Sequence, residues 1–117
     1  MPERVQLKRT KGWRMPPNTV KVDRTTGYGN PFPVKNCRDA QDSVDRFRNH
    51  LESIIDEPSV RANIERLRGK NLACWCKITS PDEYVPCHAD VLLSIANDIP
   101  LDEVIRENYR RAKGKAM

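Results

Sequence analysis

A short apolar segment that carries two cysteines constrains this chain more than any other feature. Cys74 and Cys76 stand at alternate positions of this segment, whose length and composition are typical of a buried strand. Because alternate side chains of a strand share a face, we expect the two thiols on one face and Trp75 on the other, packed under a helix. After a ten-residue loop, Cys87 and His88 follow at the expected start of a helix. The spacing predicts that these groups meet at one site.

The order of the surrounding patterns predicts the fold class. Residues 4–9 and 19–24 alternate polar and apolar side chains, which indicates two half-buried strands. Helical patterns begin near Asp39 and at Pro58, and the strand predicted over residues 72–76 comes after them. A strand that follows helices reaches its sheet through a crossover, which favours parallel pairing. We therefore predict a small single-domain α/β sheet, at least partly parallel, with helices packed on it.

The length and the apolar runs predict one domain and no membrane segment. The chain has 117 residues, enough for a single core. We expect residues 1–100 to form the α/β domain with the cysteine and histidine cluster, and residues 101–117 to form a C-terminal helix and a basic tail. No apolar run approaches the ~20 residues that span a bilayer, and residues 1–4 lead into no apolar signal segment. The expectation is a cytoplasmic protein with reduced thiols.

Two loops are expected to share a pocket at the ends of the strands. Open α/β sheets bind ligands outside the carboxyl ends of their strands, and the loops at residues 27–32 and 76–87 would both emerge there. Gly27 and Gly29 could let backbone N–H groups approach a phosphate, although a plain structural turn explains them as well. The first functional hypothesis is thus a pocket for a nucleotide or another phosphorylated ligand.

The cysteine cluster has the composition of a zinc site. Cys74, Cys76, Cys87 and His88 would supply three thiolates and one imidazole, a normal set for a structural tetrahedral site. The spacing departs from common sites, since Cys87 and His88 are adjacent and adjacent ligands are strained. One of the four could therefore be a neighbour rather than a ligand. Asp90 is a candidate to hold the His88 ring through its other nitrogen.

A second chemical reading makes one cysteine a nucleophile. In this reading Cys76, or alternatively Cys87 at the helix start, attacks, His88 is the base and Asp90 orients the imidazole, which is the logic of a Cys-His-Asp relay. In a third reading the cysteines are small apolar core residues and His88 begins the helix. The residue pattern alone leaves all three open.

Basic residues near the N-terminus raise the possibility of an anionic partner. Residues 1–24 contain seven lysines and arginines against two acidic residues, which equals the whole formal excess of +5. These cations either solubilise the chain or contact phosphates in a zinc-stabilised nucleic-acid-binding module. The predicted phosphate contacts are Arg4, Lys8, Arg9, Lys11 and Arg14. A third hypothesis is an accessory protein that acts through protein contacts.

The motifs also resemble a known family. Residues 29–32 read Gly-Asn-Pro-Phe, residues 67–76 end in Cys-Trp-Cys, and residues 86–92 read Pro-Cys-His-Ala-Asp-Val-Leu. Together they resemble the family of phage and bacterial proteins catalogued as domain of unknown function 4326, which has no established activity. This sequence has Ala89 where the family pattern leads us to expect glycine, and a longer loop before Cys87. The resemblance implies a shared site formed by Asn30, Cys74, Cys76, Cys87, His88 and Asp90.

Overall fold

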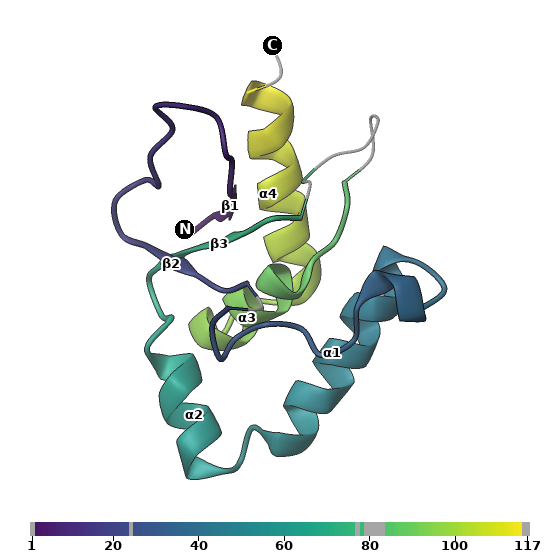
Figure 1. Ribbon diagram of the computed structural model, residues 1–117. Helices are drawn as coiled ribbons and strands as arrows, with labels where there is room; N and C mark the ends of the chain where they lie inside the picture. The colour runs from purple at the N-terminus through teal and green to yellow at the C-terminus, as the bar shows by residue number, and fades with distance from the viewer. Residues whose placement is uncertain (1, 24, 77, 79–83, 116–117) are drawn as a thin grey trace.

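The computed structural model describes residues 2–23, 25–76, 78 and 84–115. Four helices and a three-stranded sheet form the small α/β domain that the sequence predicts (Figure 1). In chain order the elements are β1 (Arg4–Gln6), β2 (Thr19–Lys21), the short 3-10 helix η1 (Val34–Asn36), α1 (Ala40–Ile54), α2 (Pro58–Glu65), β3 (Asn71–Cys74), α3 (His88–Asn97) and α4 (Leu101–Lys115).

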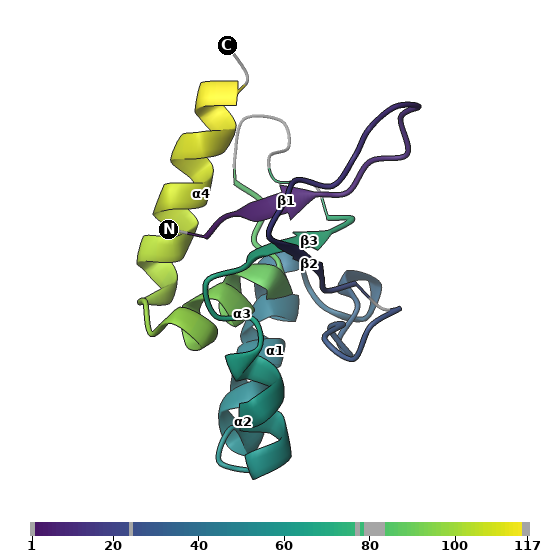
Figure 2. The ribbon, with the colours of Figure 1, turned by 90° about the vertical axis from the view of Figure 1, so that its left-hand side faces the viewer.

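The sheet is parallel throughout, with β3 between β1 and β2 (Figure 2). In the register, Leu72 of β3 lies opposite Arg4 on one side and Val20 on the other. This order confirms the predicted crossover, because the chain passes through α1 and α2 before β3 enters the middle of the sheet. The strands are shorter than the alternating patterns suggested. β3 ends at Cys74, so Trp75 and Cys76 lie beyond it.

Helix α3 is the centre of the main core. It contacts β1 and β3 as well as α1, α2 and α4, and seven of its ten residues are buried. Leu72 and Cys74 point from β3 into this core, which they share with apolar side chains of α1 and α3. Because α3 holds the helices against the sheet, its first residues occupy a fixed position at the end of β3.

The other face of the sheet has a much smaller core. Ala73 points to this face, where it joins Val5 and Leu7, and Trp13 from the loop between β1 and β2 packs against the three. A loop therefore covers this face in place of a helix. Among the described helices, none combines the length and the apolar character that crossing a membrane requires.

Candidate metal centre and ligand pocket

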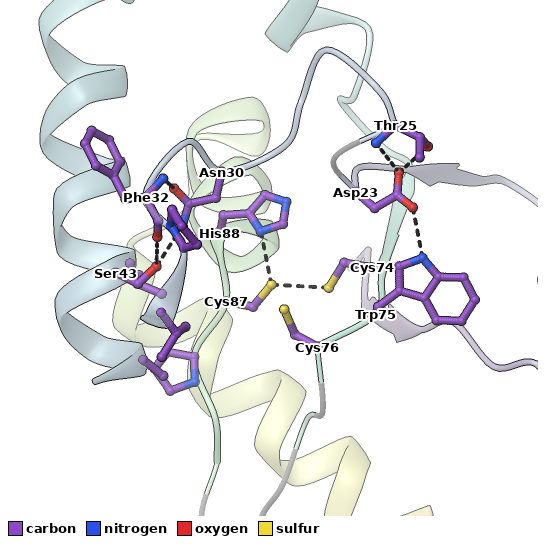
Figure 3. A pocket seen from close by; sticks show the side chains of 15 residues that line it. Asp23, Thr25, Asn30, Phe32, Ser43, Cys74, Trp75, Cys76, Cys87 and His88 are labelled. Carbon is purple, nitrogen blue, oxygen red and sulfur yellow. Dashed lines mark hydrogen bonds between the residues drawn. The ribbon is translucent and has the colours of Figure 1, made fainter. Parts of the chain in front are cut away.

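Three cysteines converge at the carboxyl end of β3 (Figure 3). Cys74 is the last residue of the strand, Cys76 follows two residues later, and Cys87 is the residue before α3. Their Sγ atoms all lie within 4.8 Å of one another, and those of Cys74 and Cys87 are 3.2 Å apart. Cys74 and Cys87 are buried, whereas Cys76 is exposed. The three thiols could together hold a metal ion.

The sulfur spacing suits a tetrahedral metal ion. Zinc binds thiolate sulfur at about 2.3 Å, which places two sulfurs of a tetrahedral site about 3.8 Å apart. The 3.2 Å between Cys74 and Cys87 and the 4.8 Å limit of the group lie on either side of this value. A disulfide needs about 2.05 Å between its sulfurs, and all the cysteines are free.

Without a metal the three thiols keep their protons at neutral pH. The interaction with Cys76, together with burial, raises the pKa of Cys74 to about 11. The hydrogen bond shared with Cys74, together with burial, raises the pKa of Cys87 to about 12. The interaction with Cys74 lowers the pKa of Cys76, but that with Cys87 and partial burial outweigh it and raise the pKa to about 11. These values give no support to an activated cysteine nucleophile.

His88 lies next to the three thiols but outside their group. Its Nε2 is 2.6 Å from the carbonyl oxygen of Val22, and its Nδ1 is 3.3 Å from Sγ of Cys87. A carbonyl oxygen only accepts hydrogen bonds, so Nε2 carries the proton. Burial lowers the pKa of His88. The structure therefore places His88, the expected fourth ligand, beside Cys87 and outside the group of three sulfurs.

Asp90 does not orient His88, so the proposed Cys76, His88 and Asp90 relay is not formed. Its Oδ2 accepts a hydrogen bond from the backbone N–H of Cys87 at 3.0 Å and lies 3.3 Å from the Arg4 guanidinium. The other oxygen accepts from the Tyr84 hydroxyl and from Asn108. Asp90 is fully buried. It therefore fixes the backbone of Cys87 in place of the imidazole.

Arg4 is the partner of Asp90 and is not available to nucleic acid. Only 2% of the residue is exposed, and its guanidinium also donates to the carbonyl oxygens of Cys76 and Val85. Burial opposes the positive charge, but the nearby Cys87 and Asp90 outweigh it and raise the pKa. The prediction of a phosphate contact is wrong for Arg4, because β1 turns this side chain toward the helices. It positions the chain around two of the cysteines instead.

The thiols lie in a cavity of about 460 Å³ at the ends of β2 and β3. This cavity confirms the expected meeting of two loops, since Asn30 and Phe32 of one loop and Cys76 and Pro86 of the other line it together. Of the second loop, residues 77 and 79–83 lie outside the described residues. The remaining lining residues are Asp23, Thr25, Pro33, Val34, Ala40, Ser43, Val44, Cys74, Trp75, Cys87 and His88.

The non-sulfur polar groups of the wall are mostly engaged with one another. Asn30 accepts from the N–H of Phe32 at 2.8 Å and donates to the Ser43 hydroxyl at 2.9 Å, while Ser43 donates to the Phe32 carbonyl. Asn30, which the resemblance placed in the site, thus holds its loop against α1. Gly27 and Gly29 line neighbouring hollows outside the thiol cavity. The loop therefore brings Asn30 to the thiols and leaves both glycines away from them.

Asp23 and Trp75 form a wall that the sequence did not predict. Trp75 does not pack under a helix, because β3 ends before it and the residue is 41% exposed. Its Nε1 donates to Asp23 at 2.9 Å. Burial acts to raise the pKa of Asp23, but hydrogen bonds from Thr25 and Trp75 and the charge of Lys21 outweigh it and lower the pKa. The only local sequence signal for the position of Asp23 was the turn pattern of Asp23 and Thr25, in which an aspartate accepts from the backbone N–H two residues later.

Fold and site define a small parallel α/β domain with three thiols at its strand ends. The chain belongs to the family described as domain of unknown function DUF4326, whose model matches residues 5–98. It is also similar to an uncharacterized 12.4 kDa protein from the nrdA-td intergenic region of Enterobacteria phage T4, with 28% identity over 85 residues that cover 72% of each chain. No solved structure matches it. These findings confirm the resemblance seen in the motifs.

Proposed function

We propose that this protein binds a zinc ion through Cys74, Cys76 and Cys87 and presents it to a ligand in the adjoining cavity. The observation that carries the proposal is the convergence of three sulfurs within 4.8 Å on the wall of that cavity. Thiolate sets of this kind favour zinc over magnesium or calcium, which take oxygen ligands. Zinc is the specific choice because it accepts three thiolates in a tetrahedral geometry.

The fourth coordination position is proposed to face the cavity. His88 lies outside the sulfur group, so its imidazole is proposed to support Cys87 rather than bind the metal. Zinc sites with three protein ligands and one exchangeable position bind water or substrate, while closed four-ligand sites are structural. A water bound there would be more acidic than bulk water and could serve as a nucleophile. This arrangement supports a reactive site more than a purely structural one.

The cavity supports an uncharged ligand better than a phosphate. Its described lining is mainly apolar and contains Asp23 but no lysine or arginine. The polar groups of Asn30 and Ser43 form hydrogen bonds within the wall. The three sulfurs are therefore the main groups of the wall that can interact with a ligand or a metal ion. We therefore propose that a nucleotide would place its base, and not a phosphate, inside the cavity. We also propose that the protein is cytoplasmic, because free thiols persist in the reducing cytoplasm.

Metal analysis tests the proposal directly. Untagged protein purified without chelator is expected to contain about one zinc ion per chain, from the single group of three thiolates. Cobalt substitution should give sulfur-to-cobalt charge-transfer absorption and the intense visible bands of a tetrahedral site. Addition of imidazole should shift those bands if the fourth position is open. A closed site would leave the spectrum unchanged.

Cys37 provides a matched control for the cysteine variants. It is a free cysteine before α1 and is not a member of the sulfur group. Cys76→Ser is expected to abolish stoichiometric zinc binding, whereas Cys37→Ser should bind zinc like the wild type. Folded wild-type protein that stays free of metal after dialysis against excess zinc would disprove the proposal. So would unchanged zinc binding by the Cys76→Ser variant.

A further inference from the structure

We infer that the protein binds single-stranded nucleic acid, with one base against Trp75 at the mouth of the cavity and the backbone along a basic loop. The basic loop comprises residues 7–18 and carries Lys8, Arg9, Lys11 and Arg14. The inference goes beyond the metal site, because it names the class of ligand, a nucleic acid, whose base would occupy the cavity. It uses different residues from the metal proposal, so the two can fail separately.

Trp75 is an exposed aromatic side chain held in a fixed orientation. It is 41% exposed, lines the cavity and follows the strand that carries Cys74. Its Nε1 is bonded to Asp23, which is itself buried and receives two further hydrogen bonds from Thr25 (Figure 3). Exposed tryptophan is unfavourable in water, and a buried carboxylate that fixes its ring preorganises an aromatic surface. Such a surface suits a flat ring that stacks on it.

Arg9 joins the basic loop to this aromatic surface. The centre of its guanidinium lies 4.8 Å from the centroid of the Trp75 ring. This cation–π contact is exposed, and contacts of that kind are weaker than the stacking of a base on an aromatic side chain. A base could therefore displace the guanidinium from the ring and leave it free for the neighbouring phosphate. The loop and the mouth of the cavity thus belong to one surface.

The basic loop is free to meet an anion. Its four cationic side chains are exposed, and residues 7–18 include no acidic residue. Among the described residues, none of the four forms an ion pair. The loop is anchored rather than loose, since Trp13 packs against Val5, Leu7 and Ala73. It therefore holds unneutralised positive charge close to the sheet.

Single-stranded nucleic acid fits this combination of features. Proteins that bind it without sequence preference pair a positive groove for the backbone with aromatic side chains on which bases stack. A duplex would keep its bases in the stack, so a base can reach the cavity only from a single strand or after flipping. The cavity of about 460 Å³ has room for one base. The described cavity wall lacks cations, which agrees with phosphates that stay outside on the loop.

Tryptophan fluorescence provides the direct test. In the Trp13→Phe background Trp75 is the only tryptophan, so quenching reports on the proposed stacking surface. Zinc-loaded protein is titrated with short single-stranded DNA and RNA oligonucleotides, with the matching duplexes, and with free nucleosides. Single strands are expected to quench Trp75 and to bind at least tenfold more tightly than the nucleosides. If none of the single strands quenches the fluorescence of Trp75, the inference is overturned.

Two triple variants with the same charge change test the basic loop. Lys8→Ala, Lys11→Ala and Arg14→Ala remove three cations from the loop, and Arg48→Ala, Arg61→Ala and Arg66→Ala remove three exposed cations from α1 and the region of α2. The first triple should weaken single-strand binding and reduce the slope of log K against log salt by about 2. The second should leave that slope unchanged. Equal effects of the two triples would overturn the assignment of the backbone to the loop.

The metal is tested separately in the same assay. Cys76→Ser should lose zinc, yet a folded sample should still quench through Trp75, because the stacking surface does not include a thiol. If zinc binds and no strand does, the metal proposal stands and this inference falls. Trp75→Ala should bind single strands at least fivefold more weakly than wild type, as measured by the anisotropy of a labelled oligonucleotide. Unchanged affinity in Trp75→Ala would overturn the stacking role.

Discussion

Helices α1 and α3 begin with the same local chemistry but have different ion-pair partners. Each has an aspartate at its third helical position, Asp42 in α1 and Asp90 in α3, that accepts a hydrogen bond from a backbone N–H just before the helix. Negative charge at a helix N-terminus is favourable in both places. The pairing partners differ. Asp42 meets the largely exposed side chains of Arg38 and Arg46, whereas Asp90 meets buried Arg4.

The difference shows how one capping motif can serve either a helix or a site. The hydrogen bonds of Asp42 are local, since its partners lie within four residues. Asp90 instead joins β1, the chain before α3 and α4 through Arg4, Tyr84 and Asn108. Both side chains of the Arg4 and Asp90 pair are completely buried. These contacts therefore fix the N-terminus of α3, next to Cys87.

The largest expected effect is the loss of the buried charge pair. Asp90→Asn should lower the free energy of unfolding by about 3–5 kcal/mol, because Arg4 would stay charged and buried without its carboxylate. Asp42→Asn, at the same position of the other helix, should have a much smaller effect. Urea denaturation of both variants measures the difference. Equal losses would show that burial of the arginine partner does not distinguish the two aspartates.

A double-mutant cycle sharpens the comparison. Arg4→Met removes the guanidinium while it keeps an apolar stem in the core. Arg4→Met combined with Asp90→Asn should be less destabilising than the sum of the single variants by about 0.5–3 kcal/mol, since each change relieves the charge that the other leaves unpaired. Chemical denaturation of the four proteins gives this coupling. An additive result would mean that the pair contributes no specific interaction.

The residues directly before the two helices test whether the α3 end also holds metal. Cys87→Ser and Asp39→Ser both leave a good capping residue, so each metal-free variant should stay close to metal-free wild type. With zinc at 100 times its Kd, wild type should gain about 2.7 kcal/mol. The Cys87→Ser variant should lose most of that gain, and the Asp39→Ser variant should keep it. Thermal melts with and without zinc measure the gain, and an equal zinc response in both variants contradicts the metal centre.

The smallest effect concerns pH and Asp42 at the start of α1. The backbone hydrogen bond from Arg38 is the main cause that lowers the pKa of Asp42, and Arg46 adds to it. A lowered pKa means that the carboxylate stabilises the folded protein above its ordinary pKa and that this contribution is lost as the pH falls through the lowered value. Asp42→Asn should therefore show a slightly smaller loss of stability between neutral and acidic pH than wild type. A steeper loss in the variant would contradict this sign.

Local patterns were enough to predict the parallel sheet and the meeting of the three thiols. Helices between strands require a crossover, and parallel strands place Cys74 and the start of α3 at one end of the sheet. The predicted C-terminal end of this strand was wrong. Residues 72–76 form one apolar run in the sequence, but strand pairing stops at Cys74. Because Trp75 lies beyond the strand, the alternation of strand side chains could not predict its orientation.

Long-range partners were beyond any local pattern. Arg4 lies in a basic segment, where neighbouring cations such as Lys8 and Arg9 are exposed, so charge composition alone predicts a surface role. Its burial depends on Asp90, 86 positions away in the chain. His88 likewise reads as a ligand beside Cys87, until the fold supplies the carbonyl of Val22 as a partner for Nε2.

The contact between the two ends of the chain also sets an order of events in folding. The backbone N–H of Arg4 donates to Asn108, across 104 positions of sequence, and within the described part of the chain β1 pairs only with β3. Contacts this distant form late, because closure of a long loop costs entropy before any contact is gained. During synthesis the contact between Arg4 and Asn108 can form only after α4 has been made. Through Asn108, the last helix also holds Asp90, the residue that fixes the backbone of Cys87.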